Sequence, residues 1–503
     1  MRLELNLDFE RHFAPDRFFF GVAYAPYCEG GGLNTDEGFK NSDWTKQQRA
    51  PARDDREGIG FWDTYAEHIA LAASLGLNAF RMGIEWARCQ PSPSTGTCYP
   101  PPWDERALDH YADMVECVID HGMQPIITLH HFTHPLWLGM DMWLEDDGPD
   151  LLVDGQLTIV DEINSRLMAR GGKRMAHFLV YNEPNLVPFF YHLTDWYPGD
   201  LKGPEYLLRA FDSMLSRYVR AYDGIHDLFD ERDWGVPHVG YTIASLCSYE
   251  FDKQLDDLLR LRAWGVPRDA VGSRIASCRA AWRGRIDDLA RSQLTDQQFE
   301  RYEATVASAA DMLPAEGFTK TLDALYSSSR ARKLDYLSLN VYEPFGAPRR
   351  DPDDASRGVP WGRYTMDGEV YRTFIHAKND SNDGLPVYMG ENSCANMQPI
   401  GEAPVPRPDG WTRERYLKTY LMEMVRCMKE GVPIEGYLYW TLVDDVYPPR
   451  LGLYNYDFVE HRIRETDGFG RPSGKIFGHL VAALRSGDKT KISEAFVREF
   501  EPT

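Results

Sequence analysis

Residues 178–185 read Phe178-Leu179-Val180-Tyr181-Asn182-Glu183-Pro184-Asn185. The first four side chains suit a buried strand. Pro184 cannot donate a hydrogen bond to a sheet ladder, so we expect the strand to end at or just before Glu183. This ending leaves an amide and a carboxylic acid side by side at the C-terminal tip of an apolar strand.

A second stretch repeats this arrangement. Residues 386–393 read Pro386-Val387-Tyr388-Met389-Gly390-Glu391-Asn392-Ser393. Either glutamate alone is equally compatible with a solvated loop. Two carboxylates on the tips of two buried strands are what double-carboxylate chemistry needs, above all glycoside hydrolysis. The pair therefore favours a catalytic site over two solvated loop residues.

The composition limits the kinds of binding partner and the cellular compartment that we expect for this protein. The 503 residues carry 77 acidic and 55 basic side chains, a net charge of −22, which argues against nucleic acid or an anionic membrane surface as a partner. The N-terminal residues 1–13 alternate charge, and no later stretch has the length of a spanning helix, so we expect neither a secretory signal nor a membrane anchor. The eight cysteines are scattered without a CxxC pair, which predicts reduced thiols, no metal site and a cytoplasmic protein.

Short apolar runs alternate with helical stretches along the chain. Helical spacing is found near 61–75, 105–120 and 158–171. Eight runs read as buried strands, at 17–24, 78–84, 124–130, 178–183, 237–244, 335–341, 386–391 and 434–440. The length alone suggests two or three domains. The alternation instead predicts an α/β fold in which residues 1–503 form a single (β/α)8 TIM barrel.

Three segments do not fit a minimal barrel. The stretch from about 200 to 333 is long for one connection between strands, and its helix-forming, charged composition predicts a helical insertion. The polar segments 347–384 and 395–411 are expected to be long loops near the site.

Polar residues at the predicted strand ends define a candidate site, because a barrel of this kind places its working groups there. They are Arg81, His130 or His131, Asn182, Glu183, Asn340, Tyr342, Glu391 and Trp440. With their neighbours, they resemble glycoside hydrolase family 1, the β-glucosidase-like retaining enzymes, along nearly the whole chain. The matching segments are 20–23, 79–88, 128–135, 182–184, 340–342, 391–392 and 436–445.

The resemblance implies roles for the two glutamates and their supports. Glu183 would be the general acid and then the base, which requires a raised pKa. Glu391 would be the nucleophile, kept ionised by Arg81 and the Tyr342 hydroxyl.

The other implied contacts are with the sugar of a small-molecule glycoside. Asn182 would donate to its 2-hydroxyl, His131 would bind another hydroxyl, and Trp440 would offer a flat platform. Asn340 is about equally compatible with binding the sugar and with shaping a turn, whereas His130 and His134 are interpreted as packing residues. The resemblance implies no metal and no organic cofactor.

Departures from the family pattern concern the sugar-binding residues. The family usually has Tyr-Gln-x-Glu-Gly after the first strand, and Cys28 stands at the glutamine position without a gap, or Tyr27 or Glu29 with one. Tyr447 stands where the sugar-binding glutamate after the eighth strand would lie. Phe132 and Thr133 replace the usual Trp-Asp.

These departures predict a retained reaction with a changed sugar preference. A site that lacks hydroxyl-binding acceptors relaxes or redirects its choice of sugar, so we expect a preference other than plain glucose, for a deoxy, amino or otherwise modified sugar. The alternatives are a transglycosidase acting on a natural-product glycoside, a non-catalytic sugar-binding relative, and an unrelated barrel hydrolase that uses the same two glutamates.

Overall fold

The structure is a computed structural model. It describes residues 3–27, 58–92, 99–194, 199–349, 365–396, 406–407, 409–445 and 450–500. Three positions weighed for the sugar site, Cys28, Glu29 and Tyr447, lie outside these ranges.

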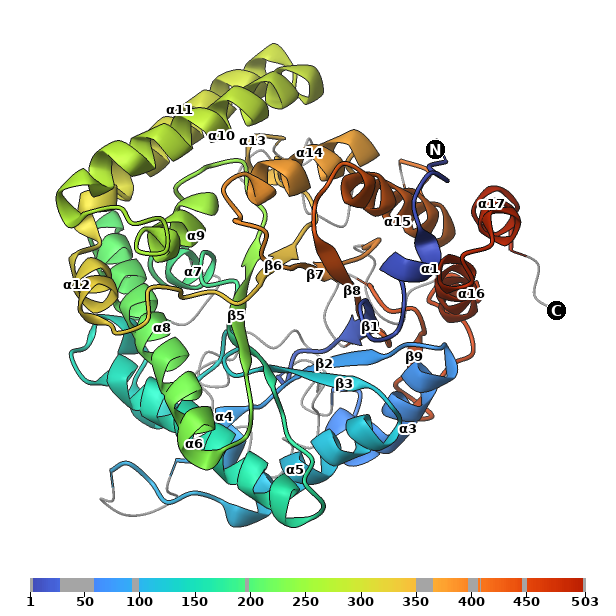
Figure 1. Ribbon diagram of the computed structural model, residues 1–503, viewed down its shortest axis with the longest axis horizontal. Helices are drawn as coiled ribbons and strands as arrows, with labels where there is room; N and C mark the ends of the chain where they lie inside the picture. Colours follow the sequence, from blue (N-terminus) through green and yellow to red (C-terminus); the bar gives the residue numbers. More distant parts are fainter. Residues whose placement is uncertain are drawn as a thin grey trace.

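Eight parallel strands close into a barrel in chain order, with β1 hydrogen-bonded to both β2 and β8 (Figure 1). They are β1 (Phe19–Ala23), β2 (Ala79–Gly83), β3 (Gln124–Thr128), β4 (His177–Asn182), β5 (His238–Ala244), β6 (Leu337–Asn340), β7 (Val387–Asn392) and β8 (Ile434–Trp440). Nearly all their residues are buried, as strands covered by helices outside and packed side chains inside require. The predicted (β/α)8 barrel and its eight strands are confirmed.

Helices surround the barrel (Figure 1). The predicted helices at 61–75 and 105–120 are confirmed, whereas the one predicted at 158–171 begins earlier, at Gly148, with Pro149 in a first turn that tolerates its missing N–H. Outside the insertion, the helices are α1 (Phe9–His12), α3 (Phe61–Ser74), α4 (Trp86–Cys89), α5 (Glu105–Asp120), η3 (Leu136–Leu138), η4 (Met142–Leu144), α6 (Gly148–Ala169), α7 (Val187–His192), α13 (Gly346–Arg349), α14 (Gly368–Asn379), α15 (Arg413–Lys429), α16 (Ser473–Arg485) and α17 (Lys489–Val497). A short antiparallel hairpin, β9 (Tyr456–Asp457) with β10 (Arg462–Ile463), follows the barrel.

The stretch 200–333 is not one insertion, because β5 divides it. Before β5 it holds only α8 (Pro204–Arg232), the ordinary helix of a β/α unit. The extra helices all lie between β5 and β6, and α10 and α11 run together at the periphery of the barrel (Figure 1). They are α9 (Lys253–Arg260), η5 (Arg268–Ala270), α10 (Val271–Gln293), α11 (Asp296–Met312), η6 (Ala315–Gly317) and α12 (Thr319–Ser327).

The long loop predicted at 347–384 is wrong over part of its length, because this segment contains α14. The helix begins after Asp367, whose side chain accepts a hydrogen bond from the N–H of Glu369. Its buried face has helical spacing, which the polar residues between had obscured; the large apolar side chains on it are Val370, Tyr371, Phe374 and Ile375. Of the second predicted loop, 397–405 and 408 lie outside the described residues.

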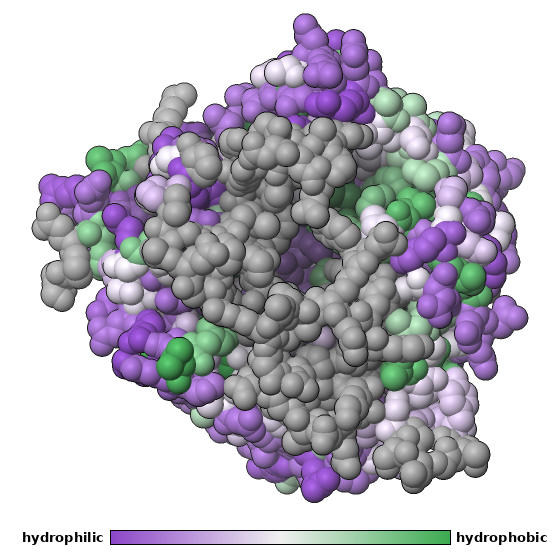
Figure 2. All heavy atoms as spheres, turned by 180° about the vertical axis from the view of Figure 1, so that it is seen from behind, coloured by the Kyte–Doolittle hydropathy of each residue, from purple (hydrophilic) through white to green (hydrophobic). Residues whose placement is uncertain are grey.

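The described surface is mostly hydrophilic, with small, separate hydrophobic areas on the face opposite to that of Figure 1 (Figure 2). This face is hollowed at its centre, and hydrophilic residues lie within the hollow. Among the described residues, no helix combines the length and hydrophobicity that crossing a membrane requires.

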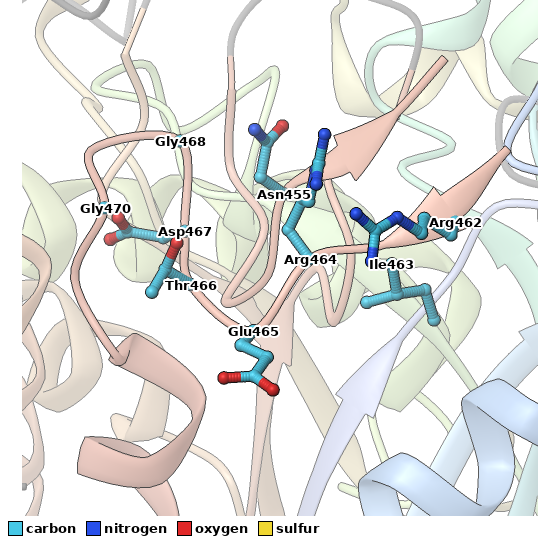
Figure 3. Close-up of a pocket in the computed structure, with 9 residues that line it drawn as sticks. All are labelled: Asn455, Arg462, Ile463, Arg464, Glu465, Thr466, Asp467, Gly468 and Gly470. Atoms are coloured by element: carbon cyan, nitrogen blue, oxygen red, sulfur yellow. The ribbon is translucent and has the colours of Figure 1, made fainter. Parts of the chain in front are cut away.

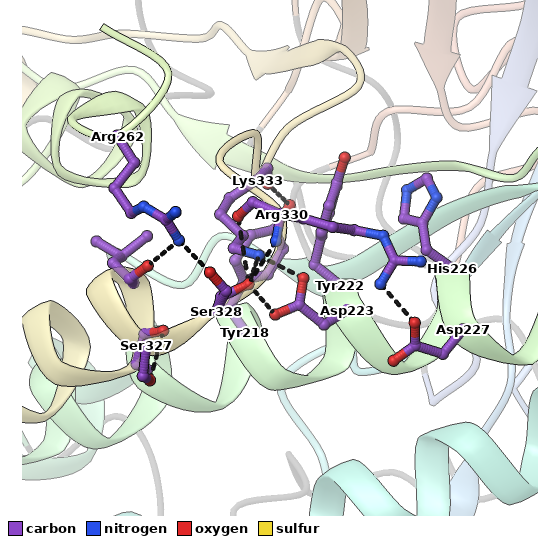
Figure 4. Close-up of polar contacts among 12 residues, drawn as sticks. Tyr218, Tyr222, Asp223, His226, Asp227, Arg262, Ser327, Ser328, Arg330 and Lys333 are labelled. Carbon is purple, nitrogen blue, oxygen red and sulfur yellow. Dashed lines mark hydrogen bonds and ion pairs between the residues drawn. The ribbon is translucent and has the colours of Figure 1, made fainter. Parts of the chain in front are cut away.

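A buried ion pair fastens α8 to the segment that leads into β6. The fully buried Lys333 side chain pairs with Asp223 and donates to Ser328 Oγ at 2.6 Å (Figure 4). Arg330 makes a comparable pair with Asp227 of α8, but Asp227 is 58% exposed. The two pairs therefore differ in burial, and also because Arg330 has a second carboxylate partner, Asp230, at 3.0 Å.

We expect Asp223→Ala to lower the thermal midpoint of unfolding by several degrees, because it leaves a buried ammonium unpaired, at about 3 kcal/mol. Asp227→Ala, the matched control, removes a solvated pair worth about 0–1 kcal/mol. Differential scanning fluorimetry of both variants measures the contrast, and equal shifts would contradict it.

Candidate active site

The carboxyl ends of the strands bring together six of the predicted site residues. Arg81 lies on β2, Asn182 at the end of β4, and Glu183 directly after it. The register of β6 and β7 shifts after Leu339, which places Asn340 opposite Glu391, and Tyr342 follows β6. Residues far apart in the sequence therefore share one polar cluster inside an otherwise apolar barrel.

Arg81 is the hub of this cluster. Its guanidinium is fully buried and donates through Nη1 to Glu391 Oε1 at 2.8 Å and through Nη2 to Asn182 Oδ1 at 2.5 Å. Nε donates to Thr128 Oγ1 at 3.0 Å. A buried guanidinium needs such partners, and its fixed fork in turn orients the carboxylate and the amide.

Glu391 is buried but surrounded by groups that favour its charged form. The Tyr342 hydroxyl donates to Glu391 Oε2 at 3.1 Å, opposite the Arg81 contact. Burial raises the pKa of Glu391 above its ordinary value, and Arg81, Tyr342 and Asn340 limit this rise. The preceding residue must be glycine, because a Cβ on Gly390 would collide with the Ser338 and Thr242 side chains.

Glu183 has a different environment. Its φ of 46° is left-handed, and its N–H donates to the Thr242 carbonyl at 2.8 Å. Its side chain is buried and, among the residues that the structure describes, receives one hydrogen bond, from Asn340 Nδ2 to Oε1 at 2.9 Å. Burial, reinforced by the charge of Glu391, raises the pKa of Glu183 to about 8, so this carboxyl is protonated at neutral pH.

Asn340 lies between the two carboxyls. Thr242 Oγ1 donates to Asn340 Oδ1 at 2.7 Å, which turns the Asn340 amide N–H groups toward Glu183 and Asn182. Thr242 has no signal in the sequence beyond being a polar residue inside an apolar strand, and sequence reasoning missed it. Asn340 is the last residue of β6, so it is not a turn residue.

Two buried N–H or ring nitrogen groups near Arg81 have no hydrogen-bond partner among the described residues. They are Asn182 Nδ2 and His131 Nδ1. Burial lowers the pKa of His131 well below its usual value, and the charge of Arg81 adds to this effect, so the imidazole is neutral. Its ring centre is 5.6 Å from that of Trp440, which ends β8. These groups are suited to bind hydroxyls beside an aromatic face.

The remaining histidines of this loop are packing residues, as expected. The His130 ring packs edge-on against Trp143 and Tyr181, with ring centres 5.5 and 5.7 Å away. His134 Nε2 contacts the Gly139 carbonyl at 2.9 Å. Tyr27 is buried shortly after β1 ends at Ala23, which is in register with Trp440.

Two hollows lie away from the glutamates. One, of about 510 Å³, is formed by the β9–β10 hairpin and the loop before α16 (Figure 3), and its lining is Asn455, Arg462, Ile463, Arg464, Glu465, Thr466, Asp467, Gly468 and Gly470. The other, of about 840 Å³, lies at the N-terminal end of the barrel beside Phe19, His177 and Tyr388. The candidate site is therefore identified by its convergent side chains and not by a cavity.

Within the described ranges, no three His, Cys, Asp or Glu side chains are placed to hold a metal ion.

Comparison with known proteins gives a match over nearly the whole chain. The model of the family described as "Glycosyl hydrolase family 1" matches residues 10–482. An alignment of 511 positions with "Lactase/phlorizin hydrolase" of Rattus norvegicus shows 22% identity and covers 96% of this chain but only 24% of that relative's length. An alignment of 491 positions with "Probable inactive beta-glucosidase 14" of Oryza sativa subsp. japonica shows 23% identity and covers 89% of this chain and 87% of the relative.

The fold is shared with solved structures. The "beta-glycosidase from Pyrococcus horikoshii" superposes with a TM-score of 0.63 at 19% identity, over 96% of this chain and 97% of that one.

Proposed function

We propose that this chain, which belongs to glycosyl hydrolase family 1 and is a glycoside hydrolase, cleaves a β-glycoside with retention of configuration, with Glu183 as acid and base and Glu391 as nucleophile. The observation that carries the proposal is the contrast between the two buried carboxyls. Glu391 contacts the Arg81 cation at 2.8 Å, whereas Glu183 is held by the neutral amide of Asn340 and has a pKa of about 8.

In the first step, a Glu391 oxygen attacks the anomeric carbon and the bond from that carbon to the aglycone oxygen breaks. The Glu183 proton passes to the departing oxygen, so the aglycone leaves as a neutral alcohol. The products are a glycosyl ester on Glu391 and an ionised Glu183.

In the second step, Glu183 takes a proton from water and the water oxygen displaces Glu391 from the anomeric carbon. The pKa of Glu183 is suited to both steps, because part of its rise comes from the negative charge of Glu391. That charge disappears when Glu391 becomes an ester, so the pKa of Glu183 falls just when this residue must act as a base.

Sugar binding is assigned to the free donors beside the carboxyls. Asn182 Oδ1 is held by Arg81, which leaves Nδ2 to donate to the 2-hydroxyl as positive charge develops on the ring. His131 would bind a second hydroxyl, and Trp440 would cover one face of the sugar. Tyr27 is proposed to line the same pocket, and so is Tyr447, which lies outside the described residues.

The sugar preference is proposed to be shifted from plain glucose. The support is the sequence: the family glutamine is missing beside Tyr27, and Tyr447 replaces the sugar-binding glutamate. Transfer to an acceptor other than water would use the same steps. A non-catalytic sugar-binding role is disfavoured, because a binder needs no protonated carboxyl near a cation-paired one. The rice relative is itself named as a probable inactive beta-glucosidase, so turnover is the property that separates the two roles.

The test is turnover of a panel of aryl β-glycosides that covers gluco, galacto, manno, fuco, 2-deoxy and 2-amino sugars, followed by proton NMR. We expect the β-hemiacetal to appear first, with a sugar other than glucose preferred. An α-hemiacetal appearing first would contradict the mechanism, and glucose or galactose far ahead of the rest would contradict the shifted preference. Adding a simple alcohol as acceptor measures transfer of the sugar to that alcohol. If the wild type cleaves no glycoside and 2-fluoroglycosyl fluorides do not label it, the result would favour a non-catalytic sugar-binding protein.

Arg81→Gln should move the acid limb of the pH profile. Arg81 lowers the pKa of Glu391, so its loss raises that pKa and a higher pH is needed to ionise the nucleophile. We expect kcat/KM to fall by about 10²-fold at pH 6, and less at higher pH. Arg260→Gln is the control, because Arg260 is buried but donates to Ser381 and Asn382 instead of a carboxylate. An unmoved acid limb in Arg81→Gln would refute the assigned role.

A cytoplasmic location is proposed from the cysteines. The six within the described residues are all free thiols, which suits a reducing compartment. Mass spectrometry of alkylated protein from fresh extracts should find every thiol labelled; a disulfide would count against this location.

A further inference from the structure

Asn185 follows the Asn-Glu-Pro triplet directly and makes a threefold clamp on the backbone. Its side chain is fully buried, and Nδ2 donates to the Ala244 carbonyl at 2.8 Å and to the Phe251 carbonyl at 2.7 Å. Oδ1 accepts from the Ala244 N–H at 3.2 Å. Three of the hydrogen bonds available to one amide are thus made to the end of β5 and the loop after it.

The clamp lies on one side of Glu183, and a second attachment lies on the other. The N–H of Glu183 donates to the Thr242 carbonyl on the same strand that Asn185 holds at Ala244. Between these attachments Glu183 has a left-handed φ of 46°, a conformation that costs a non-glycine residue about 1–2 kcal/mol. Such a conformation persists only when the surroundings impose it.

The anchor of the clamp is itself rigid. Phe251 precedes Asp252, whose carboxylate accepts from the Leu246 N–H at 2.8 Å and pairs with Lys378 of α14. Asp252 and Lys378 are both fully buried. The Phe251 carbonyl is therefore a fixed point against which Asn185 can hold the turn.

We propose that Asn185 is a positioning residue for the acid and base Glu183: its clamp on β5 and Phe251 imposes the left-handed turn that aims the carboxyl at the leaving oxygen. This inference rests on the proposed function. It predicts a defect in proton donation and not a general loss of activity, because Asn185 contacts neither Glu391 nor Arg81 through any described hydrogen bond.

The test compares Asn185→Ala with wild type on a series of aryl glycosides whose leaving groups differ in basicity. A 2,4-dinitrophenolate leaves without a proton, whereas phenolate or an alkoxide needs one. We expect kcat/KM for the phenyl glycoside to fall about 10²-fold, and that for the dinitrophenyl glycoside to stay within about threefold. Asn185→Ser, which keeps one donor, should give an intermediate loss if the alanine variant folds poorly.

Asn164→Ala is the matched control. Asn164 is also fully buried, and it clamps the Met175 backbone with Nδ2 to the carbonyl at 3.2 Å and Oδ1 from the N–H at 2.7 Å. This clamp lies near the opposite end of β4, so its loss should lower stability and affect all leaving groups alike. A uniform loss in Asn185→Ala as well would overturn the positioning role, whereas a wild type that cleaves no glycoside would instead refute the proposed function.

Discussion

Glu391→Gln is expected to lower turnover of every aryl glycoside that the wild type cleaves by about 10⁴-fold or more. The substituted amide has nearly the same shape, but it cannot form the glycosyl ester. Substrate binding should persist, because Asn182, His131 and Trp440 are unchanged. Stopped-assay kinetics on the best substrate, with binding followed by calorimetry, measure both quantities.

The same change removes the anionic partner of a fully buried guanidinium. Arg81 would be left with neutral acceptors only, so we expect the thermal midpoint to fall as well, by an amount consistent with about 3 kcal/mol. Glu414→Gln on α15 is the control, because Glu414 is buried and pairs with Lys418 and Arg471, each at 2.7 Å. It should lose stability and keep its turnover. Retained turnover in Glu391→Gln would exclude Glu391 as the nucleophile.

The barrel could be predicted because its strands carry their own signal. Residues 178–181 and 387–389 are continuous apolar runs, and buried parallel strands need such runs regardless of what packs on them. Helix α14 could not be predicted, since its buried face is interrupted by polar residues and its partners lie on α15 and α10. Helix α9 lies in the stretch that was predicted to be helical, but the burial of its charged residues could not be predicted, because Lys378, Tyr241 and Tyr249 pair with them from distant segments.

The candidate site was predicted to the extent that strand ends could be located. Asn182, Glu183 and Glu391 each follow or end an apolar run, Arg81 lies inside one, and the fold brings the four together. The sequence does not contain the orientation of side chains, so two residues were missed: Thr242, which donates to the Asn340 amide, and Asn185, which holds the turn after Glu183 to the end of β5. Asn340 shows the same limit, because its role depends on a carboxyl 157 positions away.

Glu183→Ala should separate the two chemical steps that Glu183 serves. With a phenyl leaving group, kcat/KM should fall about 10³-fold, because the departing oxygen receives no proton. With 2,4-dinitrophenyl the first step needs no acid, so the ester on Glu391 should accumulate and its hydrolysis should limit turnover. Azide, which needs no base, should then restore turnover and give the β-glycosyl azide, whereas an α-glycosyl azide would mean that Glu183 is the nucleophile.

The pH profile gives an independent reading of the same residue. A general acid works only while protonated, and the pKa of Glu183 is about 8, so wild-type kcat/KM should be retained below that pH and fall as pH rises through it. In Glu183→Ala this alkaline limb should vanish for the phenyl glycoside, whose cleavage by the wild type needs the acid, while the acid limb set by Glu391 remains. The order of the two limbs follows from the neighbours: Arg81 and Tyr342 limit the rise that burial imposes on the pKa of Glu391, whereas the charge of Glu391 adds to the rise in the pKa of Glu183. An alkaline limb that survives in Glu183→Ala would assign the acid to another group.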